Sequence, residues 1–149
     1  MSIFRVYRND GHVVIEIFGV KMRFKNPLVN RLRDCCCISK LDYLLKQGTR
    51  FPHPVGIVIH KCVIVGKNCS IYQNVTIGGP KLDENNEYQV PKLGNNVTIF
   101  PNSCVIGAIE IGDNAIIGAG SVVVKNVPAN SMAVGNPARI IKKVEPENE

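Results

Sequence analysis

Aliphatic residues recur at every sixth position between residues 59 and 123, and this repeat constrains the fold more than any other feature of the 149-residue chain. A period of six is a multiple of the strand period of two, but not of the helical period of 3.6. Each six-residue unit is therefore expected to form one short strand and one corner, with the aliphatic side chain pointing inward. The repeat is interrupted once, and its two runs are Ile59, Val65, Ile71 and Ile77, and then Leu93, Ile99, Val105, Ile111, Ile117 and Val123.

Residues that favour turns accompany the repeat. Glycine directly follows the aliphatic residue five times, and asparagine follows it by three positions six times. Both residue types tolerate left-handed backbone angles, so we expect them to turn the chain at the corners. Three units would close a triangular coil, and stacked coils form a parallel β-helix. Antiparallel sandwich strands would not hold this register over ten positions, so the predicted fold class is mainly β, a parallel β-helix. The glycines are Gly66, Gly78, Gly94, Gly112 and Gly118, and the asparagines are Asn68, Asn74, Asn96, Asn102, Asn114 and Asn126.

The segment before the repeat predicts a small cap. Asn9-Asp10-Gly11 is typical of a β-hairpin turn, and residues 20–25 alternate between apolar and basic side chains. Asn26-Pro27 is typical of a helix start, and the pattern is helical from residue 28 to residue 46. The alternative is a break near residues 37–39, where serine competes for backbone hydrogen bonds. We expect residues 1–50 to form a β-hairpin and helical cap over the first coil, which would otherwise expose unpaired strand edges.

The rest of the chain divides into a repeat domain and a tail. The predicted β-helix domain spans residues 51–143, and residues 144–149 form an acidic tail. The interruption at residues 79–92 is polar and contains Pro80 and Pro91. A loop that leaves a regular repeat is more often functional than not, and the alternative is a tolerated surface insertion.

Composition excludes several classes of function. The net charge is +6, which suggests an anionic ligand. The chain has no Lys/Arg run with interleaved aromatic residues, so nucleic-acid binding is not predicted. A phosphate-rich cofactor fits the charge equally well. No stretch approaches about 18 uninterrupted apolar residues, so no membrane span is expected. The N-terminus lacks a signal-peptide pattern, and with six cysteines the prediction is a cytoplasmic protein with reduced thiols. Their spacing does not favour a metal site.

Three histidines are the candidates for a general base. His53 stands between Pro52 and Pro54, whose restricted backbones suit a side chain with a fixed direction. An unperturbed imidazole titrates near pH 6.5, so when neutral it can take a proton from a hydroxyl group. His60 follows an inward aliphatic residue and is expected to be an exposed corner residue. His12 adjoins the predicted hairpin turn and is expected to be a solvated surface residue.

Two segments of the repeat region carry a family resemblance. They are Phe-Pro-His-Pro-Val-Gly-Ile-Val at residues 51–58 and Ser-Ile-Tyr-Gln-Asn-Val-Thr-Ile-Gly-Gly at residues 70–79. With the repeat and the closing Gly-Asn-Pro-Ala-Arg at residues 135–139, they resemble the hexapeptide-repeat acyltransferases, above all serine acetyltransferases and related polysaccharide-cluster O-acetyltransferases. The resemblance covers about residues 51–143. It implies a left-handed β-helix, although crossovers between parallel strands are usually right-handed.

The resemblance also implies a reaction. Acetyl-CoA is the expected co-substrate, without a metal, and the acceptor is a small molecule with a hydroxyl group, either serine or a sugar. His53 corresponds to the catalytic histidine, and Asp42 or an acidic residue of the loop (Asp83, Glu84 or Glu87) is expected to orient it. We expect direct transfer, with the oxyanion held by a backbone N–H near Gly78-Gly79.

The expected coenzyme A site runs along a groove between subunits. The residues that would line the pantetheine arm are Gly78, Gly79, Pro101, Ala119 and Gly120, and those that would meet the phosphates are Lys125, Arg139 and Lys142. A homotrimer would form such grooves and bury outward apolar side chains that a monomer rarely tolerates. These side chains are Val58, Ile64, Ile106, Ile116 and Val122.

Two departures from the resembling enzymes leave the acceptor open. Serine acetyltransferases carry an aspartate where this chain has Pro52, and a second histidine where it has Val90. Two other functions are possible on such a coil. A zinc-dependent hydratase similar to the γ-class carbonic anhydrases would need three converging histidines, and a non-catalytic scaffold would need neither His53 nor the Gly78-Gly79 turn.

Overall fold

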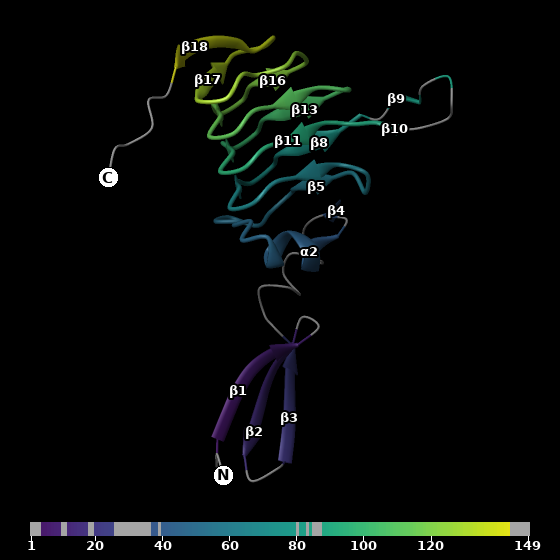
Figure 1. Cartoon of the computed structure of the whole chain (residues 1–149), viewed down its shortest axis with the longest axis vertical. Helices are drawn as coiled ribbons and strands as arrows, with labels where there is room; N and C mark the ends of the chain where they lie inside the picture. Colours follow the sequence, from purple (N-terminus) through teal and green to yellow (C-terminus); the bar gives the residue numbers. More distant parts are fainter. Residues whose placement is uncertain are drawn as a thin grey trace.

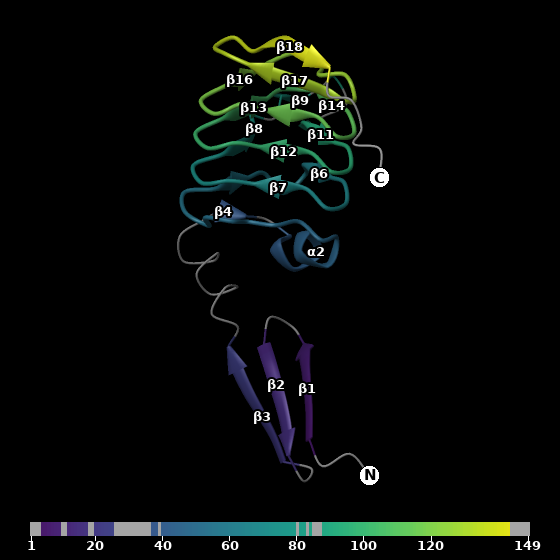
Figure 2. The same cartoon turned by 90° about the vertical axis from the view of Figure 1, so that its left-hand side faces the viewer.

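Stacked triangular coils make up most of the protein. The computed structural model describes residues 4–9, 12–17, 20–25, 37–38, 40–79, 81–82, 84 and 88–143. From residue 50 onward the chain winds into coils, each built of short strands joined by corners (Figures 1 and 2). Corresponding strands of successive coils pair in parallel and form the three faces of a prism. The predicted parallel β-helix is therefore confirmed.

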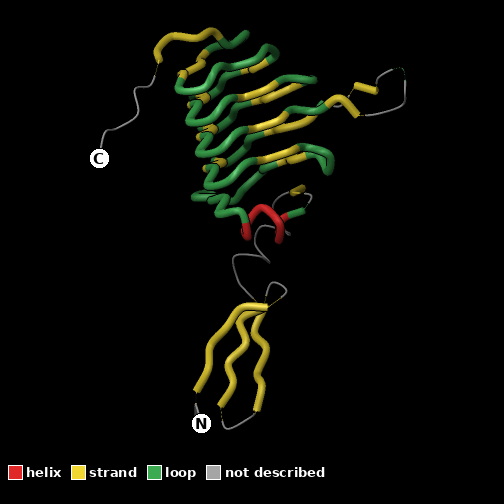
Figure 3. The backbone as a smooth tube through the Cα atoms, viewed as in Figure 1, coloured by secondary structure: helices red, strands yellow, loops and turns green. Residues whose placement is uncertain are grey.

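Each face is a ladder of two- to five-residue strands, with corner loops between the faces (Figure 3). Face 1 contains β4 (Cys37–Ile38), β5 (Val58–Ile59), β8 (Thr76–Gly78), β13 (Cys104–Ile106) and β16 (Val122–Val123). Face 2 contains β6 (Ile64–Val65), β11 (Lys92–Leu93) and β14 (Glu110–Ile111). Face 3 contains β7 (Ser70–Ile71), β12 (Thr98–Ile99), β15 (Ile116–Ile117), β17 (Ser131–Val134) and β18 (Arg139–Lys143).

The ten aliphatic residues of the repeat form the interior of the prism. None of them is more than 4 % exposed. They stack in register from coil to coil; on face 3, for example, Ile71 pairs with Ile99 and Ile99 with Ile117. Full burial of such a side chain contributes about 1.5–3 kcal/mol, so the repeat supplies most of the cohesion between coils.

Asparagine ladders hold the corners in line. The side-chain amide of Asn74 donates to Asn102 Oδ1 at 3.1 Å, that of Asn96 to Asn114 Oδ1 at 3.0 Å, and that of Asn114 to Asn130 Oδ1 at 2.8 Å. All of these residues adopt positive φ angles, as does Asn68. Five of the six asparagines predicted for the corners are therefore confirmed, and Asn130 is a corner residue that was not predicted.

Two details of the corner prediction were wrong. Asn126 is not among the residues with positive φ, and its Oδ1 instead accepts the backbone N–H of Glu110 at 2.9 Å. The glycines that follow the aliphatic residues also lack positive φ. At four of them close approach requires glycine, since a Cβ at Gly66, Gly94, Gly112 or Gly118 would overlap the neighbouring coil, as at Gly94 with Asp113.

Helix α2 (Leu41–Lys46) closes the N-terminal end of the coil stack. Leu41 and Leu44 are 6 % and 3 % exposed and belong to the same apolar cluster as the coil interior. The predicted helical range is broken at residues 37–38, within the alternative break near residues 37–39, because these residues form β4, which pairs with β5. Backbone pairing with the first coil replaces the expected helical turn there. Residues 26–36 and 39 of the predicted helix lie outside the described residues.

The N-terminal strands form an antiparallel sheet. Strands β1 (Phe4–Asn9) and β2 (His12–Ile17) pair around the predicted hairpin turn, with Asn9 opposite His12. Strand β3 (Val20–Lys25) adds to β2, which confirms the strand predicted from the alternation at residues 20–25 and gives a three-stranded sheet. The acidic tail at residues 144–149 lies outside the described residues. Among the helices that the structure describes, none has the length and apolar character needed to cross a membrane.

The interruption of the repeat forms a hairpin that projects from the stack (Figure 1). Strand β9 (Lys81–Leu82) pairs antiparallel with β10 (Tyr88–Gln89). The chain leaves the coil after β8 and rejoins it at β11, so the insertion does not disturb the pairing of the coils above and below it.

Candidate active site

Face 1 has two edges, and the predicted site residues lie on both. Because its strands are parallel, all residues that precede them lie on one edge and all residues that follow them lie on the other. We call these the leading edge (residues 52–57, 72–75, 100–103 and 118–121) and the trailing edge (residues 60–63, 79, 88–91, 107–109 and 124–126).

His53 lies on the leading edge. Its side chain is exposed, and its ring lies 6.2 Å from the ring of Tyr72 on the next coil. Tyr72 in turn stacks on Phe100 at 5.2 Å. The backbone N–H of Val55 donates to the carbonyl oxygen of His53 at 2.8 Å, which closes a tight turn there. The imidazole is thus directed along an aromatic column and remains open to a ligand.

Gly78 and Gly79 lie on the trailing edge, together with His60. Gly78 is buried and ends β8, and Gly79 is exposed with φ +68°. The backbone N–H of His60 donates to the carbonyl oxygen of Ile77 at 3.0 Å, which places His60 directly beside Gly78. The hairpin contributes Tyr88, whose ring lies 5.2 Å from the ring of His60.

Seven of the ten predicted site residues therefore fall into two groups within one chain, and Asp42, Arg139 and Lys142 lie elsewhere, on α2 and β18. Three of them share the leading edge with His53, namely Pro101, Ala119 and Gly120. Lys125 follows β16 and shares the trailing edge with Gly78 and Gly79. One chain does not bring the proposed base together with the Gly78-Gly79 turn, since the width of face 1 separates them.

Lys125 and Arg139 share a cavity of about 330 Å³ at the C-terminal end of the stack. Its other lining residues are mostly apolar, including Val124, Pro137 and Ile140. Lys125 and Arg139 are exposed, so they offer two positive charges at the mouth of an apolar hollow. This arrangement suits a ligand with an apolar body and anionic groups. Lys142 lies on the neighbouring strand β18, opposite Met132.

Two candidates for orienting His53 lie within the described residues. Asp42 is exposed in the first turn of α2, and Glu84 is exposed in the hairpin. Asp83 and Glu87 lie outside the described residues. The aromatic contact with Tyr72 was not anticipated from the sequence, because residues 53 and 72 are brought together only by the stacking of coils.

His60 is more enclosed than the sequence suggested. It was expected to be an exposed corner residue, but it is half-buried and its Nδ1 accepts the backbone N–H of Cys62 at 3.3 Å. The interruption of the repeat is the reason, since it places the hairpin residue Tyr88 against this corner.

The described cysteines do not form a reactive or metal-binding group. Cys69 is fully buried, and burial raises the pKa of its thiol, which donates to the carbonyl oxygen of Gly94 at 3.3 Å. Within the described ranges no three His, Cys, Asp or Glu residues cluster as a metal site. His53 and His60 do not converge, because they lie at opposite ends of β5.

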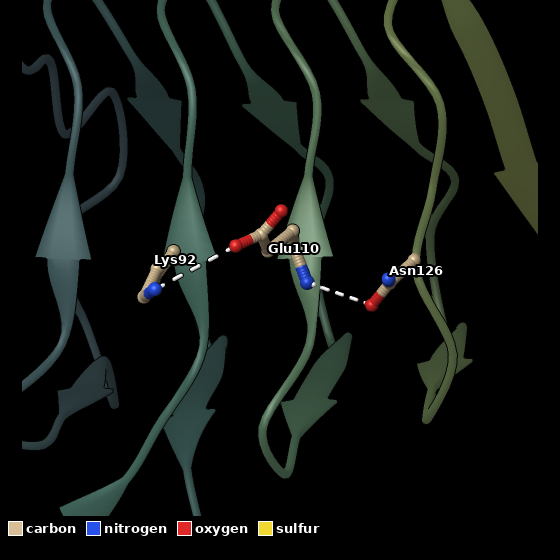
Figure 4. Close-up of polar contacts among 3 residues, drawn as sticks. All are labelled: Lys92, Glu110 and Asn126. Atoms are coloured by element: carbon tan, nitrogen blue, oxygen red, sulfur yellow. Dashed lines mark hydrogen bonds and ion pairs between the residues drawn. The ribbon is translucent and has the colours of Figure 1, made fainter.

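The outer surfaces of the three faces differ in polarity. From β5 to β16, the outward residues of faces 1 and 3 carry no charge, and they include Val58, Thr76, Thr98 and Ile116. Face 2 carries charge as well as the exposed Ile64, with Lys92 Nζ 3.6 Å from Glu110 Oε1 and the backbone N–H of Glu110 donating to Asn126 Oδ1 (Figure 4). The leading edge lies where the two uncharged faces meet.

Comparisons with known proteins agree with this geometry. Residues 91–125 match the family described as bacterial transferase hexapeptide (six repeats). The chain is 44 % identical over 97 residues to the serine acetyltransferase of Synechococcus elongatus, covering 65 % of this chain and 39 % of that protein.

Solved structures show the same likeness. The serine acetyltransferase of Neisseria gonorrhoeae superposes with a TM-score of 0.62 at 38 % identity, over 66 % of this chain and 38 % of that one. A serine acetyltransferase in complex with CoA superposes with a TM-score of 0.55 at 38 % identity, over 62 % of this chain and 36 % of that one. The chain thus spans about two-fifths of the length of these relatives.

The fold and the matches show a resemblance to the hexapeptide-repeat proteins of the bacterial transferase type, and the coil is the left-handed parallel β-helix that this resemblance predicted. More narrowly, the proteins that it matches are serine acetyltransferases, so this part of the prediction is also confirmed.

Proposed function

We propose that the protein is an acetyl-CoA-dependent O-acetyltransferase that uses His53 as general base. The observation that carries this proposal is His53 itself, an exposed imidazole held on the edge where two uncharged faces meet, within a coil similar to that of serine acetyltransferases. The acceptor hydroxyl would lose its proton to His53 while its oxygen attacks the acetyl carbonyl. The thiolate of CoA would then leave.

We further propose that the complete site forms between two copies of the chain. His53, Pro101, Ala119 and Gly120 would come from the leading edge of one copy, and Gly78, Gly79 and Lys125 from the trailing edge of its neighbour. This arrangement would bring together the leading-edge and trailing-edge residues, which lie apart within one chain. The pantetheine arm would lie in the groove between the copies, with its phosphates near Lys125, Arg139 and Lys142.

A homotrimer would provide three such grooves. Outward apolar residues support it, since Val58, Ile64 and Ile106 are 42 %, 56 % and 38 % exposed in the single chain. We expect light scattering at micromolar concentration to give about three times the chain mass of 16.4 kDa. A mass equal to that of one chain would rule out the shared site.

The phosphate site has its own test. Replacing both Lys125 and Arg139 with alanine should raise the KM for acetyl-CoA about 10-fold or more, with a smaller change in kcat, because the two cations bind the cofactor away from the reacting atoms. Steady-state kinetics at several salt concentrations measure this, and the variant should also lose most of the salt dependence of KM. An unchanged KM would place the phosphates elsewhere. Lys67→Ala, an exposed lysine on another corner, serves as the control.

Serine is the first acceptor that we propose, because the matched relatives are serine acetyltransferases. A specific observation favours a second candidate, a sugar or nucleotide sugar of surface-polysaccharide synthesis. Pro52 and Val90 stand where the resembling enzymes carry an aspartate and a second histidine, so part of the serine-recognising set is absent. Measuring CoA release from acetyl-CoA with serine, amino sugars and nucleotide sugars decides between the two.

We also propose a cytoplasmic location, which the free thiols of the four described cysteines support.

A further inference from the structure

We propose that His60 is a second catalytic residue, a hydrogen-bond donor that holds the oxygen of the thioester carbonyl as negative charge develops on it. This role rests on the proposed acetyltransferase function and adds a side-chain donor to the backbone N–H groups expected near Gly78-Gly79. The two histidines then have different roles: His53 removes a proton from the acceptor, and His60 donates a hydrogen bond without giving up its proton.

The hydrogen bond at Nδ1 fixes which nitrogen of His60 carries the proton. Nδ1 accepts the backbone N–H of Cys62 at 3.3 Å, so it must hold a lone pair. A neutral imidazole that accepts at Nδ1 carries its proton on Nε2. The atom that His60 can offer to a ligand is therefore an N–H donor and not a base.

The position of His60 matches the place where the carbonyl oxygen is expected. A Cβ added at Gly78 would lie 3.1 Å from the Cβ of His60, so the two residues are in direct contact. The next residue, Gly79, has φ +68° and is exposed, which leaves its main chain open to a close-lying ligand. His60 and the Gly78-Gly79 turn therefore lie side by side on the trailing edge.

The hairpin holds the imidazole in place. The ring of Tyr88 lies 5.2 Å from the ring of His60 at an angle of 57°. The ammonium group of Lys61 lies 5.7 Å from the centre of the same tyrosine ring. Tyr88 is therefore a positioning residue, and the inserted hairpin gains a function: it restricts the rotation of His60.

The chemical step balances with these two residues. The acceptor oxygen bonds to the acetyl carbon as its proton passes to His53, and the carbonyl oxygen becomes an oxyanion held by Nε2–H of His60. Collapse of this intermediate re-forms the carbonyl and breaks the carbon–sulfur bond. The CoA thiolate leaves and takes the proton from His53, so both histidines end in their starting state.

The glutamine variant distinguishes a donor from a base. The side-chain amide nitrogen of glutamine can reach the position of Nε2 and donate there, whereas alanine cannot donate. We expect His60→Ala to lower kcat about 10²-fold, the usual effect of losing one oxyanion donor, with the KM for acetyl-CoA changed less than about 3-fold. His60→Gln should recover most of the lost rate. Both variants should keep the acidic limb of the pH profile, which reports on His53.

Three results would overturn this role. One is a His60→Ala enzyme with the wild-type rate, and another is a His60→Gln enzyme as slow as His60→Ala and without the acidic limb. The third comes from ¹⁵N NMR of the imidazoles near pH 8, if it shows the proton of His60 on Nδ1. A wild-type protein that transfers no acetyl group to any acceptor would instead refute the proposed function, and the NMR measurement would still report the His60 geometry.

Discussion

Replacing His53 with alanine should lower kcat by about 10²–10⁴-fold, the usual contribution of a positioned general base. The exposed imidazole lies outside the coil interior, so its loss should leave the fold and the oligomer intact. The affinity for CoA should also persist, because Lys125 and Arg139 lie at the C-terminal end of the stack. Steady-state kinetics, CoA titration and light scattering measure these three quantities.

The pH profile provides the decisive readout for His53. A general base must be deprotonated, so the wild-type kcat/KM should fall as the pH drops and the imidazole becomes protonated. The His53→Ala enzyme should lack this acidic limb. Val55→Ala, an exposed change in the same turn, should keep both the rate and the limb. A His53→Ala enzyme with full activity on its true acceptor would refute the assignment of the base.

Replacing Leu93 with alanine should lower the free energy of unfolding by about 2–5 kcal/mol. Leu93 is 4 % exposed and is stacked between Val65 and Ile111, so alanine leaves a cavity between two coils. Chemical denaturation followed by circular dichroism measures the change.

Lys92 is the matched control, because it is the outward neighbour of Leu93 on the same strand. Its partner is Glu110, and their side chains are 58 % and 69 % exposed (Figure 4). An exposed ion pair of this kind contributes about 0–1 kcal/mol, so Lys92→Ala should change the stability very little. Equal losses for the two variants would contradict the inward and outward assignment of this strand.

The tertiary structure changes the meaning of the predicted site. The sequence named His53 and Gly78-Gly79 as parts of one site and did not say which edge each would occupy; within one chain they lie on opposite edges of face 1. If the site is shared between copies, as proposed, catalysis would require the chain to assemble. In the proposed assembly, His60 on the trailing edge of one copy would lie toward His53 of the next, so that base and donor would approach the thioester from two subunits.

The sequence by itself determined the coil. A period of six fixes which side chain points inward, because strand geometry alternates every two residues, and all ten predicted positions are buried. It also identified the positions where asparagine turns the chain, with Asn126 as the exception. These features are local and repeat along the chain, so they can be recognised without knowledge of distant contacts.

Only the tertiary structure decided which residues meet across coils. The contact of His53 with Tyr72, that of His60 with Tyr88 and the overlap that forbids a Cβ at Gly94 join residues about 18 to 30 positions apart. Such distances in sequence depend on the number of residues per coil and on the length of the inserted hairpin. The short helix α2 has the same origin, since pairing of residues 37–38 with β5 outweighs their local helical pattern.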